Sequence, residues 1–287
     1  MTTFALGGTS VVHRLGFGAM RITGKGTWGP PADPAAAVAL LRRTAALGVQ
    51  LIDTAGTYGP NVSEELIAEA LYPYEGLLIA TKGGWQRTGP SGWSEDGELL
   101  GWAHAGRPEQ LRAACEGSLR RLKVDRIGLY QLHWPDPDVP FEESVGALRE
   151  LQQEGKVLHV GLCNATVEQL AVARSIVEIA TVQSPFNLAD TSRADLLDEC
   201  EAHGIGFIPY RPLERGKLAE PGGPVAAVAE RHGATPGQVA LSWLLARSPV
   251  LLPIPGTTSI AHLEQNVAAA SLRLDEEEVQ AIGDAAA

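Results

Sequence analysis

The stretch Leu51-Ile52-Asp53-Thr54-Ala55-Gly56-Thr57-Tyr58-Gly59 begins as an apolar strand and ends that strand at a carboxylate. The phenol of Tyr58 follows on a short segment that Gly56, Gly59 and Pro60 mark as a turn. Two polar groups therefore lie just where a predicted strand stops.

The next predicted strand ends at a cation. Residues 77–81 are mostly apolar, and Lys82 follows them directly, ahead of two glycines. A tyrosine has an unperturbed pKa of about 10, so it is a poor acid near neutral pH unless a cation lies beside it. An ammonium at Lys82 would lower the pKa of Tyr58, and Asp53 could hold that ammonium charged. The alternative is that Asp53 and Lys82 form a structural ion pair and that Tyr58 is an aromatic residue at its rim.

Strands and helices alternate along the rest of the chain. A Gly-Gly turn between residues 4–6 and 11–12 predicts an N-terminal hairpin. No change in composition divides residues 1–287, so the pattern predicts a single (β/α)8 TIM barrel domain, of α/β class, with an N-terminal β-hairpin; a doubly wound open sheet is the alternative. Strands are expected at residues 15–18, 49–53, 77–82, 127–132, 157–162, 180–182, 205–208 and 250–254.

Helix starts are marked by capping residues. Thr166 with Gln169 and Thr235 with Gln238 both match a capping box, in which the threonine accepts a backbone hydrogen bond from the third helical residue. Asp33 before Pro34 predicts a further helix start. These positions place helices between the predicted strands.

Polar residues follow most of the predicted strands. In a barrel of this class, the carboxyl ends of the strands meet at one face, and the active site lies there. Polar side chains at the ends of several strands would all lie on this one face. Polar groups that only satisfy one another inside a core would not be expected to gather there, so the pattern favours an active site. The residues are Asp53, Lys82, His133, Asn164, Gln183 and Arg211.

Tryptophans are expected mainly in loops after strands. The segment 83–106 is long for a connection and carries three of them, so it is expected to be a loop that forms a lid or wall over a substrate. A self-packed surface loop is the alternative. The tryptophans expected in loops are Trp28, Trp85, Trp93, Trp102 and Trp134.

Composition narrows the class of protein. The net charge of −11 argues against a nucleic-acid or anionic-membrane partner. The three cysteines are far apart and odd in number, which argues against a disulfide framework or a zinc cluster and fits a reducing compartment. No metal-binding motif occurs, and neither a secretory leader nor a membrane-spanning stretch is recognisable, so a cytoplasmic location is expected. The segment 24–29 matches G-x-G-x-x-G but runs into Pro30 and Pro31 instead of a helix, so it is not expected to bind a dinucleotide.

Taken together, these motifs resemble the aldo-keto reductase family over nearly the whole chain. Within the family the chain is most similar to the bacterial branch that includes pyridoxal reductase, judging by residues 29–31 and 70–74. The matching motifs are Asp53-Thr54-Ala55 with Tyr58-Gly59, Thr81-Lys82, Leu132-His133, residues 160–164, Gln183 with Phe186-Asn187, residues 210–213, Ile254-Pro255-Gly256 and residues 262–266.

The resemblance implies reduction of an aldehyde or ketone by a nicotinamide coenzyme. It implies that Tyr58 donates the proton, that Lys82 held by Asp53 assists it, and that His133 orients the carbonyl. Asn164 and Gln183 correspond to residues that hydrogen-bond the carboxamide. The family usually stacks a tyrosine on the nicotinamide, and the resemblance places Phe186 at that position.

The remaining coenzyme contacts follow from the same resemblance. NADPH is the expected coenzyme and NADH the alternative, because Thr257, Thr258 and His262 stand where a lysine or arginine often meets the 2′-phosphate, and Gln265 stands where glutamate is common. The residues expected to bind coenzyme, besides Asp53, Asn164, Gln183 and Phe186, are Gly18, Met20, Tyr210, Arg211, Pro212, Leu213, Lys217, Gly256, Thr257, Thr258, His262, Gln265 and Asn266.

Trp28, Trp85 and Trp134 favour a small carbonyl substrate with an aromatic or flat apolar body. Two other functions stay open: a nucleotide-binding sensor or auxiliary subunit with little turnover, and a barrel isomerase or lyase that uses Lys82 as a Schiff-base amine. Asp53 disfavours the second, because it would keep that amine protonated. The sequence does not indicate the oligomeric state or the direction of the reaction.

Overall fold

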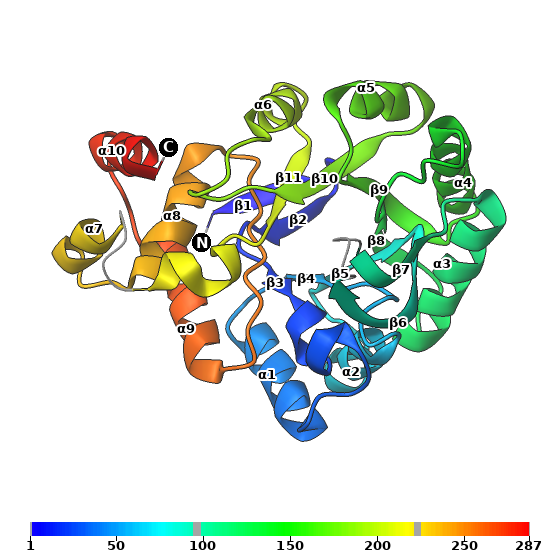
Figure 1. Cartoon of the computed structure of the whole chain (residues 1–287), viewed down its shortest axis with the longest axis horizontal. Coiled ribbons are helices and arrows are strands. Elements are labelled where there is room, and N and C mark those ends of the chain that lie inside the picture. Colours follow the sequence, from blue (N-terminus) through cyan, green and yellow to red (C-terminus); the bar gives the residue numbers. More distant parts are fainter. Residues whose placement is uncertain (1, 94–98, 221–224, 287) are drawn as a thin grey trace.

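A parallel sheet curves into a barrel, and helices surround it (Figure 1). The computed structural model describes residues 2–93, 99–220 and 225–286. The strands follow one another in the order β11-β10-β9-β8-β5-β4-β3, with parallel pairing throughout. Their bounds are β3 Phe17–Gly18, β4 Leu51–Asp53, β5 Leu78–Gly83, β8 Ile127–Leu132, β9 Val157–Cys163, β10 Ile179–Pro185 and β11 Gly206–Tyr210.

The helices begin where the capping residues predict. Asp33, Thr166 and Thr235 each accept a hydrogen bond from the backbone N–H three residues on, so these helix starts are confirmed. Helices α7 and α10 lie at the periphery of the ring (Figure 1). The bounds are α1 Pro34–Ala46, α2 Val62–Leu71, α3 Pro108–Leu122, α4 Phe141–Gln153, α5 Val167–Ile176, α6 Ala194–Ala202, α7 Ala226–Arg231, α8 Pro236–Arg247, α9 Ile260–Ala268 and α10 Glu276–Ala286.

The eighth strand, expected at residues 250–254, is reduced to an isolated bridge between Leu251 and Phe207 of β11. The backbone N–H of Leu252 also donates to the carbonyl of Phe207 at 2.8 Å. On its other side the segment meets the chain ahead of β3, where Gly16 donates to the carbonyl of Pro253 at 2.9 Å. The segment thus closes the barrel, but Pro253 and Pro255 lack N–H groups, so a regular ladder cannot extend along it.

The expected N-terminal hairpin is confirmed and covers the floor of the barrel. Strands β1 Thr3–Leu6 and β2 Ser10–His13 pair antiparallel. Leu6 and Val12 are buried in one cluster with barrel side chains such as Leu51 and Leu129. The hairpin therefore fills the barrel from below and leaves the carboxyl ends of the strands free for a site.

The segment 83–106, expected as a loop, contains a second hairpin. Strands β6 Trp85–Trp93 and β7 Leu99–His104 pair antiparallel, with an irregular register between Arg87 and Gly92. Residues 94–98 and the side chain of Trp93 lie outside the described part of the chain. The expectation of a loop is wrong for these strands, because hairpin pairing satisfies backbone groups that a loop of this length would expose, whereas a role as a lid or wall stays a prediction.

The G-x-G-x-x-G match is not part of a strand–turn–helix unit. Residues 25–27 of the G-x-G-x-x-G match form a short 3-10 turn (η2, Lys25–Thr27), and no helix follows it before Pro30. The motif therefore lacks the strand and helix that a dinucleotide fingerprint requires. Among the described helices, none combines the length and apolar character needed to cross a membrane.

Candidate active site

Inward-facing side chains of neighbouring strands converge at the carboxyl end of the barrel. Leu51, Leu78 and Leu129 pack inside the barrel near its floor. Side chains two residues apart on a strand share a face, so Asp53, Lys82 and Gln131 also point inward, above this apolar layer. Lys82 and Gln131 lie opposite each other in the register of β5 and β8.

Lys82 and Asp53 form a buried ion pair. The Nζ atom of Lys82 donates to Oδ1 of Asp53 at 2.6 Å and to the carbonyl of Thr54 at 2.8 Å. The two side chains are 0% and 3% exposed. Burial lowers the pKa of Lys82, but Asp53 and Tyr58 raise it more, and the resulting pKa lies above the ordinary value. Lys82 is therefore a fixed cation, and its protonated amine is not a nucleophile.

Tyr58 lies directly beside this cation. The Nζ atom of Lys82 is 5.3 Å from the centre of the Tyr58 ring, and the ring is 7% exposed. Lys82 lowers the pKa of Tyr58 as expected. Burial has a larger effect in the opposite direction, so the pKa of the phenol rises to about 12, and the expected net lowering is wrong for the protein alone.

His133 faces Tyr58 at the end of β8. Their ring centres are 6.0 Å apart in an edge-on arrangement. Burial, together with the nearby Lys82 charge, holds the pKa of His133 well below its ordinary value, so the imidazole is neutral near pH 7. Its Nδ1 atom is buried and has no hydrogen-bond partner among the described residues. A neutral histidine carries one N–H donor, which suits it to bind a carbonyl oxygen.

Tryptophan side chains from the hairpin adjoin His133. Trp85 stacks on Trp102 with ring centres 4.4 Å apart, and it lies 5.2 Å from His133 and 5.3 Å from Trp134. We call Trp28, Trp85, Trp102 and Trp134 the tryptophan wall. Arg87 links Trp28 to the other three, since its guanidinium carbon lies 3.9 Å from the ring centre of Trp102 and 5.4 Å from that of Trp28.

Sequence reasoning missed two of these side chains. Arg87 follows Trp85 at a two-residue spacing, and an arginine that alternates with a tryptophan in a strand was the available signal. Gln131 is an amide within an otherwise apolar strand, two residues before His133. That spacing alone predicts that Gln131 and His133 face the same side.

Gln183 bonds the ion pair directly and Asn164 lies between His133 and Tyr210, so protein groups already bind part of each amide. Gln183 donates from Nε2 to Oδ2 of Asp53 at 2.9 Å. Asn164 donates from Nδ2 to the carbonyl of His133 at 3.0 Å and accepts from the hydroxyl of Tyr210 at 2.8 Å. Within the described part of the chain, no residue bonds the Oε1 atom of Gln183 or the second N–H of the Asn164 amide, so each amide retains capacity for a ligand.

Phe186 does not lie where the resemblance placed it. Its ring is 1% exposed and packs against Phe207 and Trp243 in the layer between barrel and helices. Phe186 is buried there because it follows the end of β10 on the outward side. Tyr210, at the end of β11, is instead the half-exposed aromatic next to Asn164.

The other expected coenzyme residues lie in three segments: at and just after β3, in residues 210–217 from the end of β11, and in residues 256–266 around the start of α9. Gly18 and Gly256 approach so closely that a Cβ atom on Gly256 would lie 2.5 Å from the carbonyl oxygen of Gly18. Ser259 caps α9 through the N–H of His262. The exposed members of the set are Met20, Arg211, Lys217, Thr258, His262 and Gln265, whereas Pro212, Thr257 and Asn266 are buried and Leu213 is half-buried.

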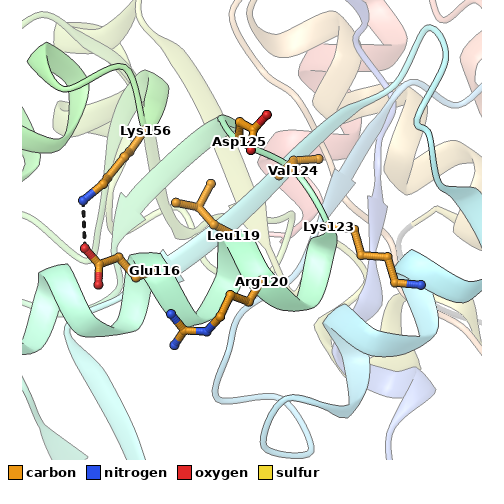
Figure 2. Close-up of a pocket in the computed structure, with 7 residues that line it drawn as sticks. All are labelled: Glu116, Leu119, Arg120, Lys123, Val124, Asp125 and Lys156. Atoms are coloured by element: carbon orange, nitrogen blue, oxygen red, sulfur yellow. Dashed lines mark hydrogen bonds and ion pairs between the residues drawn. The ribbon is translucent and has the colours of Figure 1, made fainter.

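A separate hollow lies far from these residues, beside the amino ends of β8 and β9. It has a volume of about 450 Å³ and contains the ion pair between Lys156 and Glu116 (Figure 2). None of the residues proposed for coenzyme or catalysis lines it. Its lining residues are Glu116, Leu119, Arg120, Lys123, Val124, Asp125 and Lys156.

The chain is similar in sequence to known proteins over nearly its whole length. The sequence pattern of the Aldo/keto reductase family matches residues 14–287. The chain belongs to this family. As an aldo-keto reductase it is an oxidoreductase, and the barrel architecture predicted from the sequence is confirmed.

Individual relatives extend over almost the full length of this aldo-keto reductase. It is 43% identical over 283 residues to pyridoxine 4-dehydrogenase of Escherichia coli, covering 96% of this chain and 95% of that protein. It is 46% identical over 270 residues to an uncharacterised oxidoreductase of Schizosaccharomyces pombe, covering 94% and 85%. A crystal structure of an aldo/keto reductase from Klebsiella pneumoniae in complex with NADP and acetate superposes with a TM-score of 0.81 at 28% identity, covering 98% and 93%.

Proposed function

We propose that this aldo-keto reductase reduces an aldehyde or ketone to an alcohol with NADPH, and that Tyr58 donates the proton. The observation that carries the proposal is the joint burial of Tyr58, the Lys82–Asp53 ion pair and a neutral His133 at the carboxyl end of the barrel. A phenol, a fixed cation beside it and a neutral N–H donor are the groups that carbonyl reduction needs from a protein.

Each residue has a distinct task. When bound, the coenzyme supplies a hydride to the carbonyl carbon. His133 donates a hydrogen bond to the carbonyl oxygen and fixes its position. Tyr58 transfers its proton to that oxygen, and the adjacent Lys82 ammonium stabilises the phenolate that remains. Asp53 keeps Lys82 charged and in place.

The residues expected to bind coenzyme, around Tyr210 and the start of α9, fit a dinucleotide. Gln183 and Asn164 retain hydrogen-bonding capacity for a carboxamide, and the half-exposed ring of Tyr210, fixed at its hydroxyl by Asn164, offers a stacking surface in place of Phe186. Arg211 and Lys217 are exposed cations suited to phosphate. The first turn of α9, with Thr258 and His262, offers backbone N–H groups for a further phosphate.

The substrate that we favour is a small carbonyl compound with a flat aromatic ring. The support is the tryptophan wall, whose member Trp85 lies edge-on to His133 at 5.2 Å, next to the proposed position of the carbonyl. The Escherichia coli relative is named as a pyridoxine dehydrogenase, so pyridoxal is the first compound to test. The preference for NADPH over NADH and the cytoplasmic location stay predictions.

The experiment begins with titration of purified protein by NADPH and by NADH, followed through tryptophan fluorescence. Pyridoxal, benzaldehyde and aliphatic ketones are then added while coenzyme absorbance is recorded. The proposal expects quenching and carbonyl-dependent oxidation of NADPH. It also expects the Tyr58→Phe variant to bind NADPH normally and to lose turnover, whereas Tyr72→Phe, at an exposed position, behaves as wild type. Tight quenching without turnover of any carbonyl would favour the sensor alternative.

A further inference from the structure

The buried carboxylate of Asp53 receives hydrogen bonds from two side-chain amides in addition to Lys82. Gln183 of β10 donates to Oδ2 at 2.9 Å, and Gln131 of β8 donates to the same oxygen at 3.2 Å. A buried carboxylate with one cation partner keeps unsatisfied lone pairs, and each further donor favours its charged form and restricts its orientation. The resemblance to the family gave no role to Gln131.

The fold makes room for Gln131 through a glycine on the strand beside it. In register, Gln131 of β8 lies opposite Gly161 of β9, and Gly161 lies opposite Thr181 of β10. A Cβ atom on Gly161 would lie 2.9 Å from Cγ of Gln131 and would collide with the Thr181 hydroxyl. The absence of a side chain at Gly161 therefore lets the side chains of β8 and β10 meet across β9.

The Thr181 hydroxyl sets the orientation of the Gln131 amide. It donates to Oε1 of Gln131 at 3.5 Å, a long bond that leaves Nε2 facing Asp53. Thr181 and Gln131 are both fully buried, so water does not compete for these groups. The result is a chain of polar contacts that runs from Thr181 through Gln131 and Asp53 to Lys82.

We propose that Gln131 is a positioning residue for proton transfer, which acts on Tyr58 through Asp53 and Lys82. The inference rests on the proposed function for its kinetic consequence, but its structural part stands on the contact chain itself. Gln131 fixes Oδ2 of Asp53, so that Oδ1 stays aimed at the Lys82 ammonium. Lys82 in turn stays at the distance from which it stabilises the Tyr58 phenolate.

The structural part is tested without turnover, by NMR of the Lys82 ammonium in protein labelled with nitrogen-15 at lysine. The buried ammonium is expected to give a signal protected from exchange with water, which Lys82→Met assigns by its absence. Gln131→Met keeps the length of the side chain and removes the amide. We expect exchange in Gln131→Met to be faster by about tenfold, the equivalent of one lost hydrogen bond to a charged group. The matched control, Gln152→Met, removes an amide whose one side-chain hydrogen bond among the described residues is to the carbonyl of Leu158, and it should leave the signal unchanged.

The kinetic part is tested with pyridoxal or benzaldehyde and NADPH, and with the corresponding alcohol and NADP⁺. Tyr58 is faced by Lys82, Asp53, Cys163 and His133, and only Lys82 lowers its pKa. A less well held Lys82 therefore raises the pH at which alcohol oxidation reaches half its maximum. We expect kcat of Gln131→Met to fall by about tenfold, with KM for NADPH unchanged. Thr181→Val should shift the profile in the same direction by less.

The outcomes separate this inference from the proposed function. If Tyr58→Phe keeps full turnover, the proposed function fails, and the NMR comparison still decides the role of Gln131. If Tyr58→Phe is inactive while Gln131→Met matches wild type in ammonium exchange, kcat and pH profile, the inference is overturned and the amide only fills space. A loss of NADPH binding and kcat together, with an unmoved pH profile, would also overturn it, because it indicates general disruption.

Discussion

The guanidinium carbon of Arg87 lies 3.9 Å from the centre of the Trp102 ring. The same guanidinium carbon lies 5.4 Å from the centre of the Trp28 ring. The Nη2 atom of Arg87 donates to the carbonyl of Gly26 at 3.0 Å and to that of Gly89 at 2.9 Å. Trp28 in turn bridges to Gly59, the residue after Tyr58. One side chain thus connects the β6–β7 hairpin to the loop that adjoins the proposed proton donor.

Replacement of this cation should alter substrate binding more than chemistry. Arg87→Met removes contacts of about 0.5–2 kcal/mol with the aromatic rings. We expect KM for pyridoxal or benzaldehyde to rise about fivefold with kcat nearly unchanged, measured by steady-state kinetics. Arg120→Met, on the exposed face of α3, is the matched control. An unchanged KM for every flat aromatic carbonyl would contradict a wall held in place by Arg87.

Loss of charge at Asp53 should destabilise the fold strongly. Asp53→Asn leaves the Lys82 ammonium buried without its counter-ion, which costs about 3–5 kcal/mol in the free energy of unfolding. Glu264→Gln breaks the ion pair with Arg43, whose side chains are 46% and 44% exposed, and should cost at most about 1 kcal/mol. Urea unfolding of the two variants measures the difference, and equal losses would contradict the burial of the pair.

Phe186 packs in the core and Tyr210 takes the proposed stacking role, so substitutions of the two residues should have different effects. Phe186→Ala leaves a cavity beside Phe207 and Trp243 and should lower the free energy of unfolding by about 3–5 kcal/mol, while the dissociation constant of NADPH stays near the wild-type value. Tyr210→Ala should weaken NADPH binding and cost less stability. Fluorescence titration and urea unfolding of both variants distinguish these results from the reverse pattern, which would restore Phe186 as the stacking residue.

Acidification should loosen the barrel floor through His159. Its Nε2 atom shares a hydrogen bond of 2.8 Å with the hydroxyl of Ser10 in the hairpin. Burial lowers the pKa of His159, with Glu178 opposing and Arg126 adding to the shift. The unfolded chain therefore binds a proton more readily than the folded one, so stability is full above about pH 6.5 and declines below it.

The check is the urea midpoint of wild type and His159→Gln at several pH values across this range. The variant is expected to lose part of the decline at acid pH. Ser10→Ala, which keeps the histidine and removes its partner, is expected to retain the decline. A wild-type midpoint that does not fall in acid would contradict the assignment.

Most of the fold could be read from the sequence because its signals are local. The apolar runs of the strands and the threonine caps at Thr166 and Thr235 depend on residues close in the chain, and the structure confirms the caps and the strands of the barrel sheet. The segment 250–254 has the apolar content of a strand. A regular ladder also needs backbone N–H donors, and Pro253 has no N–H group, so the expected strand does not form fully. The hairpin in residues 83–106 was missed because its pairing joins segments whose pattern does not alternate cleanly.

The candidate site was predictable in its residue types and less so in its contacts. Asp53, Lys82 and His133 each end a strand, so the topology alone brings them to one face. Their roles stay predictions. The facing of Phe186 depends on how the chain leaves β10, which no periodicity in the sequence encodes. The net pKa of Tyr58 depends on the balance between burial and one cation, and burial is a property of the whole fold.

The irregular closure of the barrel at residues 250–254 has a consequence for local opening of the fold. Phe207 and Gly16 hold opposite sides of this segment through scattered backbone bonds, so it is the place where hydrogen exchange should start. Gly256 and Ser259 follow immediately downstream and face the rim proposed for coenzyme. A dinucleotide that contacts both Tyr210 and Ser259 would connect the chain on the two sides of this irregular segment. The coenzyme-bound enzyme would then resist heat and proteases better than the free protein, because binding stabilises the closed barrel.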